Sequence, residues 1–364
     1  MNYFRSEDDV MEFDRRQFLS TGAVIAATSS MFAQDANKDP YADGVLKKGP
    51  PPIPEKGSFC VILLPDTQHY SERFPKTFTI QTTWIAEQKK SRNIQGVLHL
   101  GDITNRNTVA EWKNASASMT VVEEVKLPFA YCPGNHDYSR GGGGTDRTTL
   151  LNEYFSIERL KKQSTFGGSY DREPTRTENS FHRWTIRDRS FLILALEFGP
   201  RNDVLRWAND VLDKHPRHEA IVITHAFIYF DDTRYDWKTM GNKQNWNPHA
   251  YGMAKASNDD VNDGEEIWQK LISKHENVIL TLNGHVLGDG LGRFSSKTPG
   301  GRSVPQHLVN FQMRPNGGDG WLRILEFKED GTMAAVDYSP LLNKTNVSTQ
   351  NAFSVTLPKV GTAT

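Results

Sequence analysis

Apolar residues along this chain form short unbroken runs, and segments of helical periodicity separate them. The runs are SFCVILLPD (58–66), IQGVLHLGD (94–102), LPFAYCPGNHD (127–137), EAIVITHAF (219–227) and VILTLNGH (278–285). Runs of this kind are typical of strands buried on both faces. Apolar residues at helical spacing occupy the segments between them, at 74–93, 107–125, 202–214 and 264–277. The alternation predicts a parallel or mixed sheet with helices packed on it.

Three further segments complete the predicted domain, which we place at 58–357. The stretch 180–199 has the pattern of a hairpin, with Asp188 and Arg189 near its turn. The end of the chain, about 305–357, alternates short strands with turn residues. Residues from about 229 to 263 are rich in Trp, Tyr, Asn and Asp and are too many for a simple connection, so we expect a lid-like insertion there.

The first residues have the pattern of an export signal. Paired arginines in DRRQFLS (14–20) precede a short apolar stretch with a small-residue end, TGAVIAATSSMFA (21–33). This order resembles a twin-arginine signal peptide, which we assign to 1–33, followed by a proline-rich linker over 34–57. It predicts export to the periplasm or the cell exterior. The alternative is a dispensable amphipathic leader.

Overall composition excludes several classes of partner. The chain has 43 Lys and Arg against 44 Asp and Glu, a formal net charge of −1, so charge gives no reason to expect nucleic acid or an anionic membrane. No apolar run is long enough to span a bilayer. Cys60 and Cys132 lie in buried runs and are expected to be free thiols. The oligomeric state stays open.

Five of the apolar runs end in polar side chains that can bind a metal. These are Asp66 and Gln68, then Asp102, then Asn135, His136 and Asp137, then His225, and finally His285. Open α/β sheets place their ligand sites at the carboxyl ends of strands. We therefore expect all five strand ends to converge on one crevice.

Together, these strand ends resemble the motifs of the calcineurin-like metallophosphoesterase family, which run D-x-H, G-D, G-N-H-D/E, H and G-H-x-H. In this chain they read Asp66-Thr67-Gln68, Gly101-Asp102, Gly134-Asn135-His136-Asp137, His225 and Gly284-His285-Val286-Leu287. The resemblance covers about 58–288, and GNHD is its most specific part. It implies an α/β fold, the four-layer αββα sandwich of that family, with a site for two divalent metal ions.

The resemblance implies a different donor set for each ion. One ion would be held by Asp102, Asn135, His225 and His285, a set that suits Mn, Zn or Fe. The other would be held by Asp66, Gln68 and the shared Asp102. Below, the set with the two histidines is called the second metal site, and the set with Asp66 and Gln68 is called the first metal site.

The first metal site departs from the family pattern. Gln68 and Leu287 stand where the family has histidines, and leucine cannot bind a metal. Gln68 can offer a carbonyl oxygen, so this oxygen-rich site is expected to bind more weakly and to favour Mg, Mn or Ca. His69 and Asp289 are two candidates for the missing donor.

In that family's chemistry, paired metals clamp the phosphoryl oxygens and lower the pKa of a bridging water to produce hydroxide. His136 would protonate the leaving alkoxide. Asp137 would either orient that imidazole or cap its loop. Arg106 is either a clamp for a phosphate oxygen or a solvated surface residue. Tyr138, Trp246 and His249 either line the substrate pocket or pack as satellite core.

The sequence therefore predicts an exported, metal-dependent hydrolase whose partner is a small-molecule phosphate monoester or diester. A rival hypothesis is an exported metal-binding protein of the same fold with little or no turnover, motivated by Gln68 and Leu287. The intact His136 and Asp137 favour the enzyme, because a protein without turnover needs no general acid.

Overall fold

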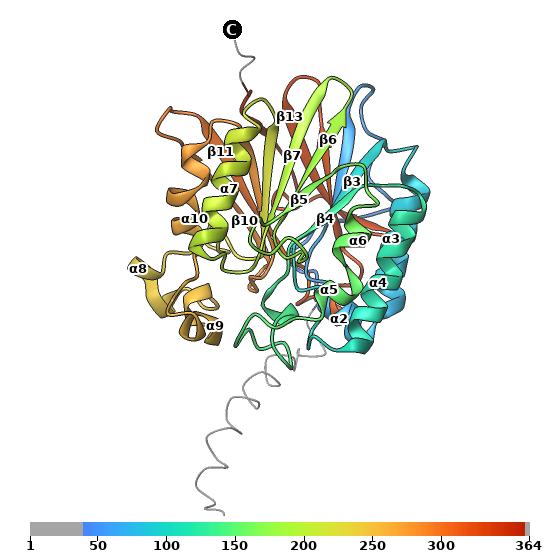
Figure 1. Ribbon diagram of the computed structural model, residues 1–364. Helices are drawn as coiled ribbons and strands as arrows, with labels where there is room; N and C mark the ends of the chain where they lie inside the picture. The colour runs from blue at the N-terminus through green and yellow to red at the C-terminus, as the bar shows by residue number, and fades with distance from the viewer. Residues whose placement is uncertain (1–38, 361–364) are drawn as a thin grey trace, which may run out of the picture. The chain divides into compact units, whose positions relative to one another are not determined.

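The predicted runs of buried apolar residues form strands of two mixed sheets within the unit Gly44–Thr364 (Figure 1). This computed structural model describes residues 39–360. The predicted signal peptide, 1–33, lies outside the described residues, as does the beginning of the predicted linker.

The first sheet holds the strands that precede the three amino-terminal motifs. Its order is β1-β14-β13-β12-β2-β3-β4, and β15 pairs with β13 outside this path. The strands are β1 (Leu46–Lys48), β2 (Phe59–Leu64), β3 (Ile94–His99), β4 (Phe129–Tyr131), β12 (Leu322–Phe327), β13 (Thr332–Ser339), β14 (Lys344–Asn346) and β15 (Ala352–Thr356). β2, β3 and β4 run parallel, so their carboxyl ends meet at one edge.

The second sheet holds the strands that precede the two histidine motifs. Its order is β10-β11-β9-β8-β7-β6-β5, and β7, β8, β9 and β11 run parallel. The strands are β5 (Phe166–Ser169), β6 (Ser180–Ile186), β7 (Arg189–Leu196), β8 (Glu219–Thr224), β9 (Val278–Asn283), β10 (Leu291–Lys297) and β11 (Ser303–Val309). β6 and β7 form the predicted hairpin.

Helices cover the outer face of each sheet. α3 (Pro75–Gln88) and α4 (Val109–Glu124) lie on one side of the two sheets, and α7 (Asn202–Lys214) and α10 (Gly264–Lys270) lie on the other (Figure 1). The sheets face each other, with the rings of Phe59 and Phe191 5.6 Å apart between their centroids. This arrangement confirms the predicted four-layer αββα sandwich.

The remaining described helices are short and lie in the connections. They are α2 (Gln68–Arg73), η2 (Asn135–Asp137), α5 (Leu151–Tyr154), α6 (Ile157–Leu160), α8 (Trp237–Met240), η3 (Gly241–Lys243), η4 (Pro248–Ala250), α9 (Gly252–Ala256), η5 (Ile272–Lys274) and α11 (Pro315–Gly318). Four of them, α8, η3, η4 and α9, lie in the predicted insertion at about 229–263. In place of regular core elements, this insertion consists of turns and single helical turns.

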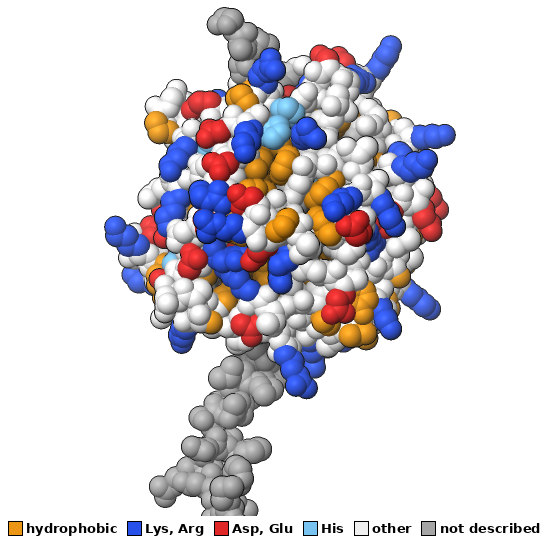
Figure 2. All heavy atoms as spheres, viewed as in Figure 1, with side chains coloured by type: hydrophobic (Ala, Val, Ile, Leu, Met, Phe, Trp, Pro, Cys, Tyr) orange, Lys and Arg blue, Asp and Glu red, His pale blue; other side chains and the backbone are white. Residues whose placement is uncertain are grey.

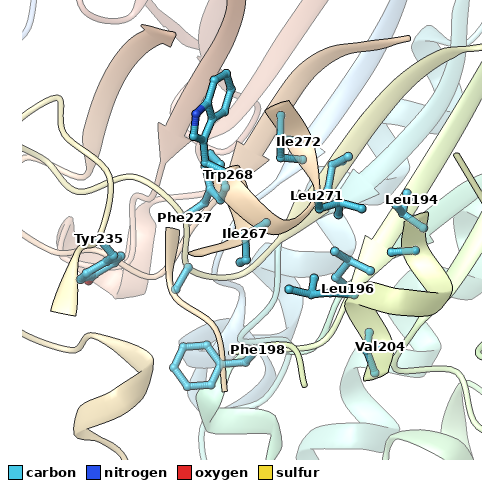
Figure 3. Packing of buried hydrophobic residues seen from close by; sticks show 14 of the residues in the cluster. Leu194, Leu196, Phe198, Val204, Phe227, Tyr235, Ile267, Trp268, Leu271 and Ile272 are labelled. Carbon is cyan, nitrogen blue, oxygen red and sulfur yellow. The ribbon is translucent and has the colours of Figure 1, made fainter. Parts of the chain in front are cut away.

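Apolar faces of α7 and α10 pack against strands of the second sheet. Figure 3 shows Val204 of α7 and Ile267 of α10 directed at the apolar layer that Leu194 and Leu196 of β7 provide. All four side chains are fully buried. A capping box begins α10, because Asp263 accepts from the Glu266 amide and the Glu266 side chain accepts from the Asp263 amide. Local sequence and core packing therefore fix the same helix start.

The predicted linker, 34–57, is partly built into the fold. Its residues Leu46–Lys48 form β1, which pairs antiparallel with β14. The guanidinium of Arg92 donates to the carbonyl oxygens of Pro51 and Pro52 at 2.8 and 3.1 Å. Three polar or half-buried residues carry no strand periodicity, so this edge strand leaves no signal in the sequence.

Charged side chains on the surface lie close to partners of opposite sign. Figure 2 shows Lys and Arg beside Asp and Glu on the face in view. On α7, Arg206 contacts Asp171 at 2.8 Å, and Arg201 before it contacts Glu173 at 2.8 Å. Within residues 39–360, no helix combines the length and apolar character that crossing a membrane requires.

Candidate active site

The predicted metal ligands lie in the connections that follow strands of both sheets. Asp66 and Asp102 come after β2 and β3, Asn135 follows β4, and His225 and His285 follow β8 and β9. Three of them have a positive φ: 44° at Asp66, 47° at Asp102 and 78° at His285. Such a conformation costs free energy in residues other than glycine and is concentrated at functional sites. The backbone thus turns sharply at these three residues to deliver their side chains.

The motif glycines leave room for those side chains. A Cβ on Gly134 would overlap the Oδ1 atom of Asp102, and one on Gly284 would overlap the Oδ2 atom of Asp66. Both glycines are therefore required by close approach at the strand ends.

The second metal site is assembled from Asp102, His225 and His285. One ligand atom from each lies within 4.8 Å of the others, and all three residues are buried. The Nδ1 atom of His225 lies 2.7 Å from the Leu100 carbonyl oxygen, so it carries the proton and leaves Nε2 facing Asp102 Oδ1 at 3.2 Å. His285 is held the opposite way, because its Nε2 lies 2.8 Å from the Trp246 carbonyl oxygen and Nδ1 remains for a metal.

Four buried atoms in this region have no hydrogen-bond partner among the described residues. They are Asp66 Oδ2, Gln68 Oε1, Asn135 Oδ1 and His225 Nε2, the last of which has only its ion-pair contact with Asp102. Buried polar atoms are nearly always paired, and a group of unpaired lone-pair donors at one place is what a cation would satisfy. All four belong to the predicted ligand sets. The residues present therefore fit divalent metal ions.

The pKa values of three buried carboxyl groups also support a site for divalent cations. Burial raises the pKa of Asp66 well above its ordinary value, and burial together with the nearby Asp102 raises that of Asp137 to about 6. Burial acts in the same direction on Asp102, but His225 and His136 outweigh it and hold its pKa below the usual range. A bound cation would favour the ionised form of all three carboxylates.

The first metal site is built around an amide. Gln68 begins α2, and its Nε2 donates to Asp102 Oδ2 at 3.2 Å and also contacts Gln312 Oε1. The two candidates for the missing donor each have partners of their own. His69 lies 3.8 Å from Glu72, and Asp289 accepts from the Leu291 amide.

His136 is oriented by backbone atoms. Its amide donates to Asp102 Oδ1 at 2.9 Å, and its Nδ1 lies 2.8 Å from the Asn105 carbonyl oxygen. Because a carbonyl only accepts, Nδ1 carries a proton and Nε2 is the nitrogen left for a substrate. Asp137 does not orient this ring. Its carboxylate accepts from the amides of Gly134, Ile103 and Thr104, so of its two predicted roles the structure supports that of loop cap.

Three of the predicted substrate-binding residues differ in exposure. Arg106 is at the surface, with 65% of its side chain exposed and its Nε 3.0 Å from Glu72 Oε1. Tyr138 is fully buried and belongs to the core of the second sheet, so of its two predicted roles the structure supports packing in the core. The two ring nitrogens of His249 contact Asp259 at 2.7 Å and Glu266 at 2.8 Å, so this histidine ties down the insertion and is not directed at substrate.

Sequence reasoning missed several groups around the site. Gln312 and the carbonyl groups of Asn105 and Trp246 contact predicted site residues, and the ring of Tyr251 lies 6.1 Å from that of His285. Carbonyl groups leave no trace in residue identity. Trp246 does carry one structural sign, a φ of 65°, which is rare for a bulky residue.

Comparison with known proteins gives a family match. The sequence profile described as "Calcineurin-like phosphoesterase" matches residues 61–323. Among curated proteins, the chain is 27% identical over 352 residues to the uncharacterized protein YvnB of Bacillus subtilis (strain 168). That alignment covers 95% of this chain and 24% of YvnB, so the chain spans about a quarter of the length of this relative.

The solved structures that match this chain have low sequence identity to it. A purple acid phosphatase, PPD1, from yellow lupin seeds is 12% identical, with a TM-score of 0.47, and the match covers 84% of this chain and 55% of PPD1. GAP50 of Plasmodium, described as the anchor in the inner membrane complex, is 12% identical with a TM-score of 0.44, covering 83% and 89%. A 5'-nucleotidase precursor from Thermus thermophilus is 11% identical with a TM-score of 0.42, covering 83% and 55%.

Proposed function

We propose that this chain, which belongs to the calcineurin-like phosphoesterase family, is an exported, metal-dependent enzyme that hydrolyses phosphate monoesters or diesters of small molecules. The observation that carries the proposal is the set of buried, unpaired oxygens of Asp66, Gln68 and Asn135, beside a His225 nitrogen whose one contact is the Asp102 carboxylate. A fold without metal chemistry would gain nothing from leaving such atoms unsatisfied at its strand ends.

Two donor sets would hold the metals. Asp102, Asn135, His225 and His285 suit Mn, Zn or Fe, and Asp66 and Gln68 with the shared Asp102 suit Mg, Mn or Ca. Bound divalent ions would supply a Lewis acid for the phosphoryl oxygens and a water of lowered pKa. Asp102 is central to both sets because its Oδ1 faces His225 and its Oδ2 faces Gln68.

His136 supplies the proton that the leaving group needs. Its Nδ1 is engaged with the Asn105 carbonyl, which fixes the ring and leaves Nε2 as the nitrogen that would carry the transferred proton. The backbone contact to Asp102 keeps this ring beside the predicted metals without making it a ligand. Metal binding and proton transfer are thus assigned to neighbouring residues, Asn135 and His136.

Export is proposed from the amino-terminal sequence. Paired arginines at Arg15 and Arg16, followed by an apolar stretch ending near Ala33, match the twin-arginine type, a route that carries folded proteins. A metal-dependent enzyme that uses this route can take up its ions before it leaves the cytoplasm.

A direct test combines hydrolysis with metal analysis. Chelated protein receives Mn, Mg or Ca, and hydrolysis of an aryl phosphate monoester and diester is followed. We expect turnover that Asp102→Asn abolishes with loss of most bound metal. Asp188→Asn, at the turn between β6 and β7 at the opposite end of the strands, is the matched control and should keep both. Wild-type protein that binds metal yet hydrolyses neither ester, over a wide panel, would instead support the metal-binding protein without turnover.

A further inference from the structure

We propose that Gln312 is a positioning residue of the first metal site, where it fixes the amide of Gln68 so that the carbonyl oxygen of Gln68 faces the ion. This inference rests on the proposed metal dependence and extends it to a residue outside every family motif. Gln312 lies 244 positions after Gln68, in the connection between β11 and β12.

The orientation of the Gln68 amide follows from its neighbours. A carboxylate without a proton only accepts hydrogen bonds, so the group 3.2 Å from Asp102 Oδ2 must be the amide nitrogen of Gln68. The same nitrogen contacts Gln312, which therefore presents its own carbonyl oxygen, Oε1. The two acceptors together occupy the nitrogen of Gln68 and turn its oxygen away from them.

The oxygen that this orientation leaves is buried and unpaired. Gln68 is 1% exposed, and its Oε1 is buried without a hydrogen-bond partner among the described residues. Oδ2 of Asp66 is buried and unpaired in the same way. A carboxylate oxygen and an amide oxygen are the donors that Mg, Ca and Mn accept, and each would otherwise bear the cost of burial without a partner.

The loop that carries Gln312 is anchored on the same side of the molecule as His285. Asn310 donates from Nδ2 to the Val286 carbonyl oxygen at 3.2 Å, and its Oδ1 accepts from the Gln312 amide at 2.9 Å. The Asn310 amide also donates to the Gly290 carbonyl oxygen at 2.7 Å. These contacts hold the backbone of Gln312 against the loop that follows β9, so that its side chain reaches across to α2.

This arrangement offers a physical reason why the chain tolerates losing two family histidines. Leu287 removes one donor and Gln68 exchanges an imidazole for an amide, which has two ends of similar shape. An imidazole can bind a metal through a ring nitrogen, whereas the oxygen and nitrogen of an amide have similar shapes, so its hydrogen-bond partners decide which of them faces the ion. Gln312, in the connection between β11 and β12, fixes the orientation of the Gln68 amide.

The test measures metal binding in the absence of substrate. Chelated full-length protein is titrated with Mn²⁺, and bound ions per chain and their Kd values are determined for wild type, Gln312→Leu, Gln312→Glu and the loop control Met313→Leu. We expect two ions in wild type and control. Gln312→Leu should raise the Kd of the more weakly held ion by about 10–100-fold and leave the Kd of the tighter ion unchanged. Gln312→Glu should keep both, because a carboxylate oxygen still accepts from Gln68.

A double substitution separates positioning from general structure. Gln68→Ala should weaken the same site, and adding Gln312→Leu should cause no further loss if Gln312 acts only through Gln68. Two ions bound by Gln312→Leu with wild-type Kd values, a further loss in the double variant, or a wild type that binds one ion would each overturn the inference. Two ions in wild type without any hydrolysis would overturn the proposed function and leave this inference standing.

Discussion

His136 and Asn135 are adjacent, yet their side chains face different tasks. Asn135 directs a buried, unpaired Oδ1 into the predicted metal site, whereas His136 is bound through Nδ1 to the Asn105 carbonyl. His136→Ala should therefore keep its metal and lose on the order of 10²–10⁴ in rate on esters with poor leaving groups. Activated aryl esters need little protonation and should lose less. Rates on matched alkyl and aryl esters, with metal content checked, decide the point, and equal losses on both would contradict the acid role.

At the scale of single residues, the strand ends in the sequence predict which side chains come together. Asp102, His225 and His285 were predicted from strand ends, and the structure places one ligand atom of each within 4.8 Å of the others. Gln312 could not be found in this way, because nothing in a single sequence links two residues 244 positions apart. The sequence does not decide the role of Asp137, because whether its carboxylate contacts a ring or three amides depends on the loop conformation.

At the scale of elements, the insertion at about 229–263 connects to the site through its backbone. The Trp246 carbonyl accepts from His285, and three residues later His249 lies between Asp259 and Glu266, the latter on α10. The ring of Trp237 stacks on His249 at 6.0 Å. His249 thus fastens the segment that orients a predicted metal ligand.

This fastening predicts a pH dependence of stability. Burial disfavours the charged form of His249, but hydrogen bonds to Glu266 and Asp259 outweigh it and raise its pKa to about 9, from an ordinary 6.5. A raised folded-state pKa stabilises the protein fully below pH 6.5, and the contribution disappears as the pH rises through about 9. His249→Gln should lower Tm by ~2–4 °C at pH 6 and by much less at pH 10.

Thermal unfolding at both pH values, with equal metal content, checks this prediction. His218→Gln is a suitable control, because burial and neighbouring positive groups lower the pKa of this half-buried histidine, so a positive charge on it does not stabilise the folded state. A Tm difference for His249→Gln that is the same at pH 6 and pH 10 would show that its ion pairs contribute nothing.

The periodicity of the chain predicted the long elements better than the short ones. The helix expected over 202–214 is α7, and the hairpin over 180–199 contains β6 and β7. β1 and β14 have three residues each and β10 ends in exposed and half-buried residues, so their pattern does not differ from that of a loop. Strands of this kind form because a neighbouring edge is available, which is a property of the assembled sheet.

At the scale of the whole molecule, the site exists only when both sheets are in place. Asp66, Asp102 and Asn135 come from the first sheet, and His225 and His285 come from the second. No single sheet carries a complete donor set for the second metal site. Folding and metal uptake should therefore be coupled, since binding energy in a site of this kind stabilises the folded state.

That coupling gives the export hypothesis a testable form. If residues 1–33 are a twin-arginine signal, the protein folds and binds metal before it crosses the membrane. Replacing Arg15 and Arg16 together by lysine should leave folded, active protein inside the cell. Cell fractionation with activity measurements tests this, and normal export of the double variant would contradict a twin-arginine route.

The central claim is that two ions, bound with unequal affinity, support phosphate ester hydrolysis. The most direct measurement is bound metal per chain and ester hydrolysis in the same samples, as Mn²⁺ is returned to chelated protein. The tighter ion should bind at the second metal site, formed by Asp102, Asn135, His225 and His285, and should give little turnover. The rate of hydrolysis should then rise as the more weakly held ion occupies the first metal site, at Asp66 and Gln68. Full activity with one tightly held ion, and no response to further Mn²⁺, would contradict the two-metal account.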